Sequence, residues 1–128
     1  MDAVFAPAPE IRRIAEAMGS DLALEPDWLN DAAKGFMPGP DDAPTTVFES
    51  ESLLVQAPSA EYLLAMKLFA SRGERDLDDA GLLFARLGYA SVEEGVGLLT
   101  RFYPAARLLP RHRFILEDVV RRAAARSA

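Results

Sequence analysis

Lys67 is the residue whose chemistry first stands out in this chain. It is the single charged residue in the run 63–70, which is otherwise Leu, Ala, Met and Phe. An ammonium group is costly to bury without an anionic partner. At helical spacing Lys67 shares a face with Leu63 and Leu64. Two readings follow: the stem covers apolar neighbours while the head reaches water, or the head is held to meet a phosphate.

Three aspartates begin nine residues after Lys67. Asp76, Asp78 and Asp79 fall where a second helix is expected to begin, and the helix dipole alone explains acids at that place. Asp76 and Asp79 share one helical face. If a turn at Gly73 folds the two helices antiparallel, either of these two carboxylates approaches Lys67. Such a pair is a structural ion pair, or it orients the lysine towards a phosphate.

Four helices are expected to position these residues in the second half of the chain. Ser59 is a suitable N-cap for the first and Gly73 a suitable stop, and Ser91 opens a capping box. The expected ranges are 59–72, 75–87, 91–104 and from Pro110 to the arginine-rich tail. Ahead of them, 45–49 and 52–56 read as two strands of a hairpin.

The first 37 residues carry weaker signals. The segment 1–5 reads as the end of a strand, and a helix is expected from Pro9 to Gly19. Asp27 is a candidate cap for a short helix that stops at Gly35. Trp28 is interpreted as a packing anchor. His112, far along the chain, is interpreted as a surface residue at a helix start.

Composition limits the classes of function. The 128 residues suggest one domain, with an α/β part at 1–57 and a helical part at 58–128. Cysteine is absent and there is one histidine, which argues against disulfides, thiolate chemistry and most histidine-based zinc sites. No apolar run approaches a membrane-spanning length, and the cytoplasm is the default compartment. A net charge of −6 disfavours sequence-independent nucleic-acid binding, and no sequence-specific DNA binding is expected.

Four blocks of sequence together resemble a bacterial family of nucleotidyltransferase-like proteins. That family is related to the nucleotidyltransferase toxins of toxin–antitoxin and abortive-infection systems. The resemblance covers nearly the whole chain, with weak further support from Phe102-Tyr103-Pro104. The blocks that carry it are Asp2-Ala3-Val4-Phe5, Trp28-Leu29-Asn30-Asp31-Ala32-Ala33-Lys34-Gly35-Phe36, Tyr62-Leu63-Leu64-Ala65-Met66-Lys67-Leu68 and Arg75-Asp76-Leu77-Asp78-Asp79.

The resemblance implies an Mg²⁺-dependent transfer that uses a nucleoside triphosphate. In such enzymes a Gly-Ser turn cradles the triphosphate, and an Asp-x-Asp pair binds the metal that neutralises phosphate charge. By position, Asp2 matches the second metal-binding acid, Lys67 the later phosphate-contacting lysine and Asp76 the final aspartate. Glu49 is a further candidate for a metal-facing acid. The implied acceptor is RNA, a protein side chain or a small molecule.

The chain departs from the family pattern at its start. It has no Gly-Ser turn, and no residue precedes Met1 to supply the first metal-binding aspartate. We therefore expect that an N-terminal segment is missing. The 128-residue chain is expected to show no nucleotide transfer, whereas an N-terminally extended form is expected to be active.

The expected fold is α/β in the broad sense that includes α+β. It consists of a truncated nucleotidyltransferase-type mixed sheet of three or four strands, with the four-helix C-terminal half packed on it. Missing strands leave an exposed sheet edge, which favours a homodimer or a cognate partner protein. Two alternatives stay open. One is a non-catalytic interaction or antitoxin-like regulatory module; the other is a small helical domain in which Lys67 and Asp76 form a structural ion pair.

Overall fold

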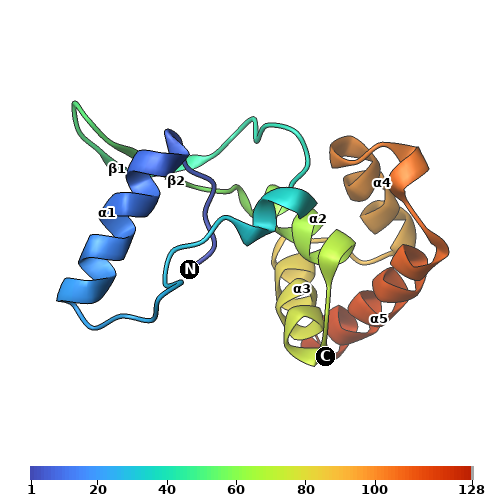
Figure 1. Ribbon diagram of the computed structural model, residues 1–128. Coiled ribbons are helices and arrows are strands. Elements are labelled where there is room, and N and C mark those ends of the chain that lie inside the picture. The colour runs from blue at the N-terminus through green and yellow to red at the C-terminus, as the bar shows by residue number, and fades with distance from the viewer. Residues whose placement is uncertain (128) are drawn as a thin grey trace. The chain divides into compact units, whose positions relative to one another are not determined.

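The computed structural model describes residues 1–127 and combines five α-helices with one two-stranded sheet, which confirms an α+β chain. Two compact units are present: Met1–Met37, and a second that begins at Pro38 (Figure 1). The sequence predicted a boundary after residue 57, between an α/β part and a helical part. In the structure the hairpin at 45–57 belongs to the same unit as the four C-terminal helices.

The first unit is built around helix α1, Ala8–Asp21, and the short 3-10 helix η1, Ala32–Phe36. Trp28 is a packing anchor as expected: its Nε1 donates to the Ala15 carbonyl at 2.8 Å, and its ring lies against Gly19. A short helix was expected with Asp27 as its cap, and this start is wrong, because the observed helix η1 begins at Ala32. Asn30 pairs with the N-terminal segment instead, and its Oδ1 accepts from the Ala32 amide at 3.1 Å.

The sheet is an antiparallel hairpin of β1, Thr45–Glu49, and β2, Leu54–Ala57. The expected hairpin is confirmed, with an irregularity in the register between Thr46 and Phe48. The expected mixed sheet of three or four strands is not found within residues 1–127. The N-terminal strand end is reduced there to a single parallel bridge between Asp2 and Asn30.

The four expected C-terminal helices are confirmed, with ends close to the sequence signals. Ser59 accepts a hydrogen bond from the Tyr62 amide at 3.2 Å, and Ser91 accepts one from the Glu94 amide at 3.2 Å, so both capping signals act as expected. The helices are α2, Ala60–Ala70; α3, Glu74–Arg86; α4, Val92–Phe102; and α5, Pro110–Ser127. A short 3-10 turn, η2, Ala105–Arg107, connects the last two.

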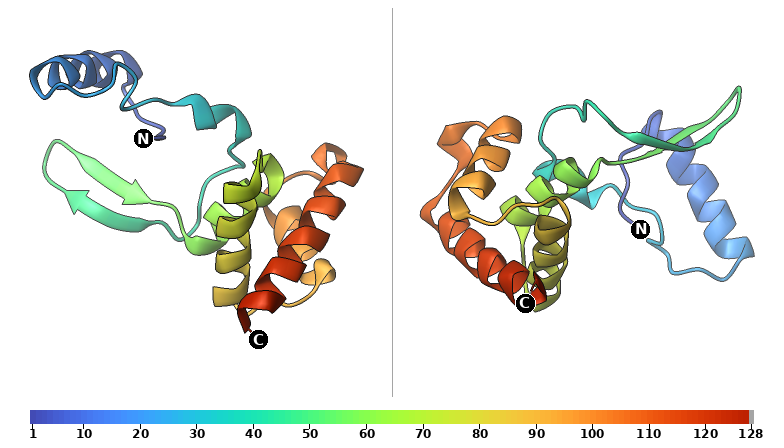
Figure 2. Two further views of the ribbon diagram at one scale, coloured as in Figure 1. Left: turned by 90° about the horizontal axis from the view of Figure 1, so that it is seen from below. Right: turned by 180° about the vertical axis from the view of Figure 1, so that it is seen from behind.

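The hydrophobic core lies among these four helices, since α3 packs along α5 and α2 contacts α3, α4 and α5. We expected the helices to pack on the sheet, and this is wrong: within the described residues neither strand makes extensive contact with a helix. Figure 2 shows the hairpin leading into the start of α2 and extending away from the four C-terminal helices. The largest fully buried side chains are Tyr103, Phe84, Leu64, Leu68, Leu98, Leu99, Leu116 and Val119.

Two further expectations concern single features. His112 was interpreted as a surface residue, and this is wrong because only 3% of it is exposed. It lies at the start of α5, where both ring nitrogens have backbone partners. Within residues 1–127, none of the helices combines the length and the apolar content that crossing a membrane requires.

Candidate functional site

Lys67 meets two aspartates at the junction of α2 and α3. Its Nζ lies 3.4 Å from Asp79 Oδ2 and 3.9 Å from Asp76 Oδ1. The antiparallel turn that the sequence suggested therefore brings both candidate carboxylates to the lysine, with Asp79 the nearer. Beyond Glu61 and Tyr62 in its first turn, the rest of α2 is apolar and buries Leu64, Leu68 and their neighbours, so Lys67 stands at the edge of the buried face.

The loop between α2 and α3 fixes the backbone around this cluster. Asp76 Oδ2 accepts a hydrogen bond from the Arg72 amide at 3.1 Å, so one carboxylate both faces Lys67 and holds the turn. Ser71 Oγ donates to the Lys67 carbonyl at 2.6 Å. Because the helix dipole also favours a carboxylate at a helix start, Asp76 is stabilised both by the Arg72 amide and by the dipole of α3.

The cluster is partly open to water. The exposed fractions of the side chains are 23% for Lys67, 39% for Asp76 and 51% for Asp79. One ammonium and two carboxylates carry a formal charge of −1 together. A bare polyphosphate would therefore be repelled, whereas a polyphosphate that arrives with a divalent cation would not. The arrangement can thus orient a lysine at the surface, and its charge favours a cation-bound anion.

The structure brings together Lys67 and Asp76 among the residues that sequence predicted for a site. Asp2 belongs to the other unit, where it is exposed and forms the bridge with Asn30. Glu49 is exposed at the end of β1 that leads into the hairpin turn. Within the described residues no group of three or more histidine or acidic side chains is placed to hold a metal ion.

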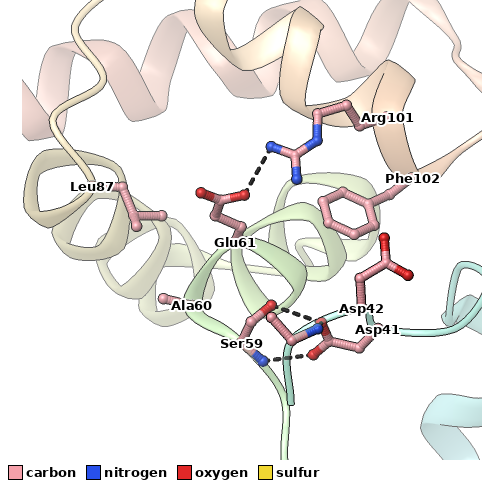
Figure 3. Close-up of a pocket in the computed structure, with 9 residues that line it drawn as sticks. Asp41, Asp42, Ser59, Ala60, Glu61, Leu87, Arg101 and Phe102 are labelled. Carbon is pink, nitrogen blue, oxygen red and sulfur yellow. Dashed lines mark hydrogen bonds and ion pairs between the residues drawn. The ribbon is translucent and has the colours of Figure 1, made fainter. Parts of the chain in front are cut away.

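A second polar site, which the sequence did not predict, is a pocket of about 290 Å³. It lies where the N-terminus of α2 meets the C-terminal ends of α3 and α4 (Figure 3). Glu61 on α2 and Arg101 on α4 form an ion pair of 2.8 Å across it. The pocket is lined by Asp41, Asp42, Ala43, Ser59, Ala60, Glu61, Leu87, Arg101 and Phe102.

Asp41 ties the loop before the hairpin to the start of α2. Its carboxylate accepts from the Ser59 amide at 2.6 Å and from the Ser59 hydroxyl at 2.9 Å (Figure 3). Desolvation opposes ionisation, but the hydrogen bonds from Ser59 and Ala43 outweigh it and hold the pKa of the Asp41 carboxyl below its ordinary value. The partners are 18 residues apart, and no local sequence signal predicts their contact.

The remaining acids at the start of α3 face α5. Arg122 lies 2.6 Å from Glu74, 2.7 Å from Asp78 and 2.9 Å from Asp118. Hydrogen bonds to these carboxylates raise the pKa of Arg122. The i, i+4 spacing of Asp118 and Arg122 is a signal that sequence reading could have used, whereas the two partners on α3 are more than 40 residues away.

Comparison with known proteins adds no relative. No family model matches the chain, and neither a curated protein nor a solved structure is significantly similar to it.

Proposed function

We propose that this chain is a nucleotidyltransferase-like protein that belongs to an Mg²⁺-dependent, nucleoside-triphosphate-using transferase of the toxin–antitoxin type. The observation that carries the proposal is Lys67, held at the edge of an apolar helix by Asp76 and Asp79. In the proposal Lys67 contacts phosphate and Asp76 completes the site. Asp2 and Glu49 are the proposed metal-facing acids. A cytoplasmic location belongs to the same proposal.

The electrostatics of the cluster support the nucleotide form that is proposed. Since Lys67, Asp76 and Asp79 carry a net formal charge of −1, a magnesium-bound triphosphate is favoured over a free one. Partial exposure leaves the ammonium reachable from solvent, and lysine is a common point-charge partner of phosphate. The 128-residue chain is proposed to bind such a complex through Lys67.

A second candidate function is a non-catalytic interaction or antitoxin-like regulatory module. It is favoured by the β1–β2 hairpin, in which large apolar side chains are exposed along both strands, including Val47 at 66% and Phe48 at 52%. A two-stranded hairpin without a further strand or covering layer is marginally stable in water. A homodimer or a cognate partner protein belongs to this second candidate.

Nucleotide titration tests the first proposal on the full 128-residue chain. ATP, GTP, CTP and UTP are each added with and without MgCl₂, and binding is followed by calorimetry and amide chemical shifts. We expect at least one nucleotide to bind with a Kd below about 1 mM only when Mg²⁺ is present. The expected shift changes surround Lys67 and Asp76.

A matched pair of variants makes the titration specific. Lys67→Gln removes the proposed phosphate contact, whereas Arg113→Gln removes one positive charge from an exposed site on α5. We expect a loss of binding of at least about tenfold in Lys67→Gln and no change in Arg113→Gln. Equal affinity in the two variants, or no binding of any nucleotide by the parent chain, contradicts the proposal. If the parent chain binds no nucleotide but forms a concentration-dependent dimer, the interaction module is favoured.

A further inference from the structure

His112 joins the start of α5 to the end of α2. Its Nδ1 lies 2.8 Å from the Leu109 amide nitrogen, and its Nε2 lies 3.1 Å from the Phe69 carbonyl oxygen. The ring stacks on Phe69 with centroids 4.8 Å apart and is only 3% exposed. One imidazole therefore satisfies a backbone amide just ahead of α5 and a backbone carbonyl in α2.

The two hydrogen bonds fix the protonation state of the ring. The Leu109 amide is a donor, so Nδ1 must accept with its lone pair and carry no proton. The Phe69 carbonyl accepts, so the ring proton lies on Nε2. The neutral Nε2–H tautomer is the form that fits this position.

Protonation of Nδ1 would place two N–H donors, that of the ring and that of Leu109, opposite each other. A proton taken from solvent at Nδ1 faces the Leu109 N–H, and the imidazolium so formed stays buried against the Phe69 ring. The charged groups around it do not compensate. Arg111, next to His112 on α5, is positively charged. Arg107 from η2 is also positively charged, and its guanidinium lies over the Phe69 ring, 4.9 Å from the centroid. The buried Tyr103 ring also stacks on Phe69, with centroids 4.1 Å apart.

Burial lowers the pKa of His112, and the positive charge of Arg111 acts in the same direction. These causes outweigh the hydrogen bond from the ring to the Phe69 carbonyl, which favours the protonated form. The neutral state is therefore retained in the closed junction at a pH where an exposed histidine is already charged.

We propose that His112 is an acid-sensitive latch that fastens the first turn of α5 to the C-terminal end of α2 and opens when its Nδ1 is protonated. The junction is closed above a pH of about 6.5, the ordinary histidine pKa, and opens increasingly below it. Since the open state binds the additional proton, lowering the pH favours opening by up to about tenfold per pH unit. This inference stands independently of the proposed nucleotide chemistry.

Amide hydrogen exchange on the full chain tests the latch. Protection of the Leu109 and His112 amides, both hydrogen-bonded in the junction, is measured at pH 7.5 and 5.5 and corrected for intrinsic exchange rates. We expect protection of these amides to fall about five- to tenfold at pH 5.5. Protection of the Leu98 and Val119 amides, which lie in the core, is expected to fall less. An equal fall at all four amides overturns a local latch, because it indicates global unfolding.

The variant His112→Gln is the control. Glutamine retains an acceptor and a donor on its side chain but does not titrate, so its junction protection should be independent of pH over this range. A fall equal to that of the parent chain overturns the proposal. If the variant does not fold, the ring-proton NMR titration of the chain's one histidine decides: a folded-state pKa at or above about 6.5 rejects the latch.

Discussion

Replacing Lys67 by methionine separates a structural ion pair from a lysine placed for a ligand. The Lys67–Asp79 and Lys67–Asp76 distances of 3.4 and 3.9 Å are long for ion pairs, and the carboxylates are 51% and 39% exposed. Exposed pairs of this kind contribute about 0.2–1 kcal/mol. Methionine keeps an apolar stem against α2, and the helix dipole still favours both aspartates. We therefore expect the free energy of unfolding to change by less than about 1 kcal/mol.

Urea unfolding at pH 7.5, followed by circular dichroism, measures this change. The stability difference is taken from the midpoints at a common m-value, because a changed m-value would indicate an altered denatured or native state. A fully buried pair that loses one partner costs about 3–5 kcal/mol. A loss of more than about 2 kcal/mol in Lys67→Met would therefore refute the reasoning and favour a structural role for the lysine.

Two pairs of substitutions test how the C-terminal helices pack together. In Gly95→Ala the new Cβ would clash with a methyl carbon of buried Leu116, so we expect a net loss of about 1–2 kcal/mol in urea unfolding despite the better helix propensity. Gly97→Ala, on the same helix with open space around it, should instead gain about 0.5–1 kcal/mol; equal effects of the two would disprove the steric argument. Arg122→Met breaks two ion pairs that join α5 to α3, with Glu74 and Asp78, and one within α5, with Asp118. Its urea midpoint should fall well below that of Arg113→Met, whose contacts are 3.8 Å or longer. Coincident midpoints would show that the Arg122 network does not stabilise the helix pair.

The sequence predicts the C-terminal helices well because their ends are determined locally. Ser59 and Ser91 each bond an amide three residues later, and Gly73 separates α2 from α3. Helical spacing likewise places Asp76 and Asp79 on one face. The contact of Lys67 with both aspartates follows once the antiparallel turn is assumed, and the structure confirms it.

The features that sequence reasoning missed depend on contacts between distant segments. The burial of His112 requires the carbonyl of Phe69, 43 residues earlier, and the pocket requires Asp41 to reach Ser59 across 18 residues. The number of strands was overestimated for a similar reason. An apolar segment such as 1–5 reads as a strand, yet only its pairing decides whether a strand forms, and here it makes one bridge.

The acids at the start of α3 divide into two sets with different physical roles. Glu74 and Asp78, four residues apart, face α5 and are held at 2.6–2.7 Å by one arginine, as expected of a structural network. Asp76 and Asp79, three residues apart, face α2 and meet Lys67 at longer distances while partly exposed. Because the network with Arg122 already fastens α3 to the core, the Lys67 cluster is not needed to position the helix. A ligand that recruits Lys67 would therefore have to break only long, partly hydrated contacts, and this is why the lysine is the side chain on which the proposed function is tested.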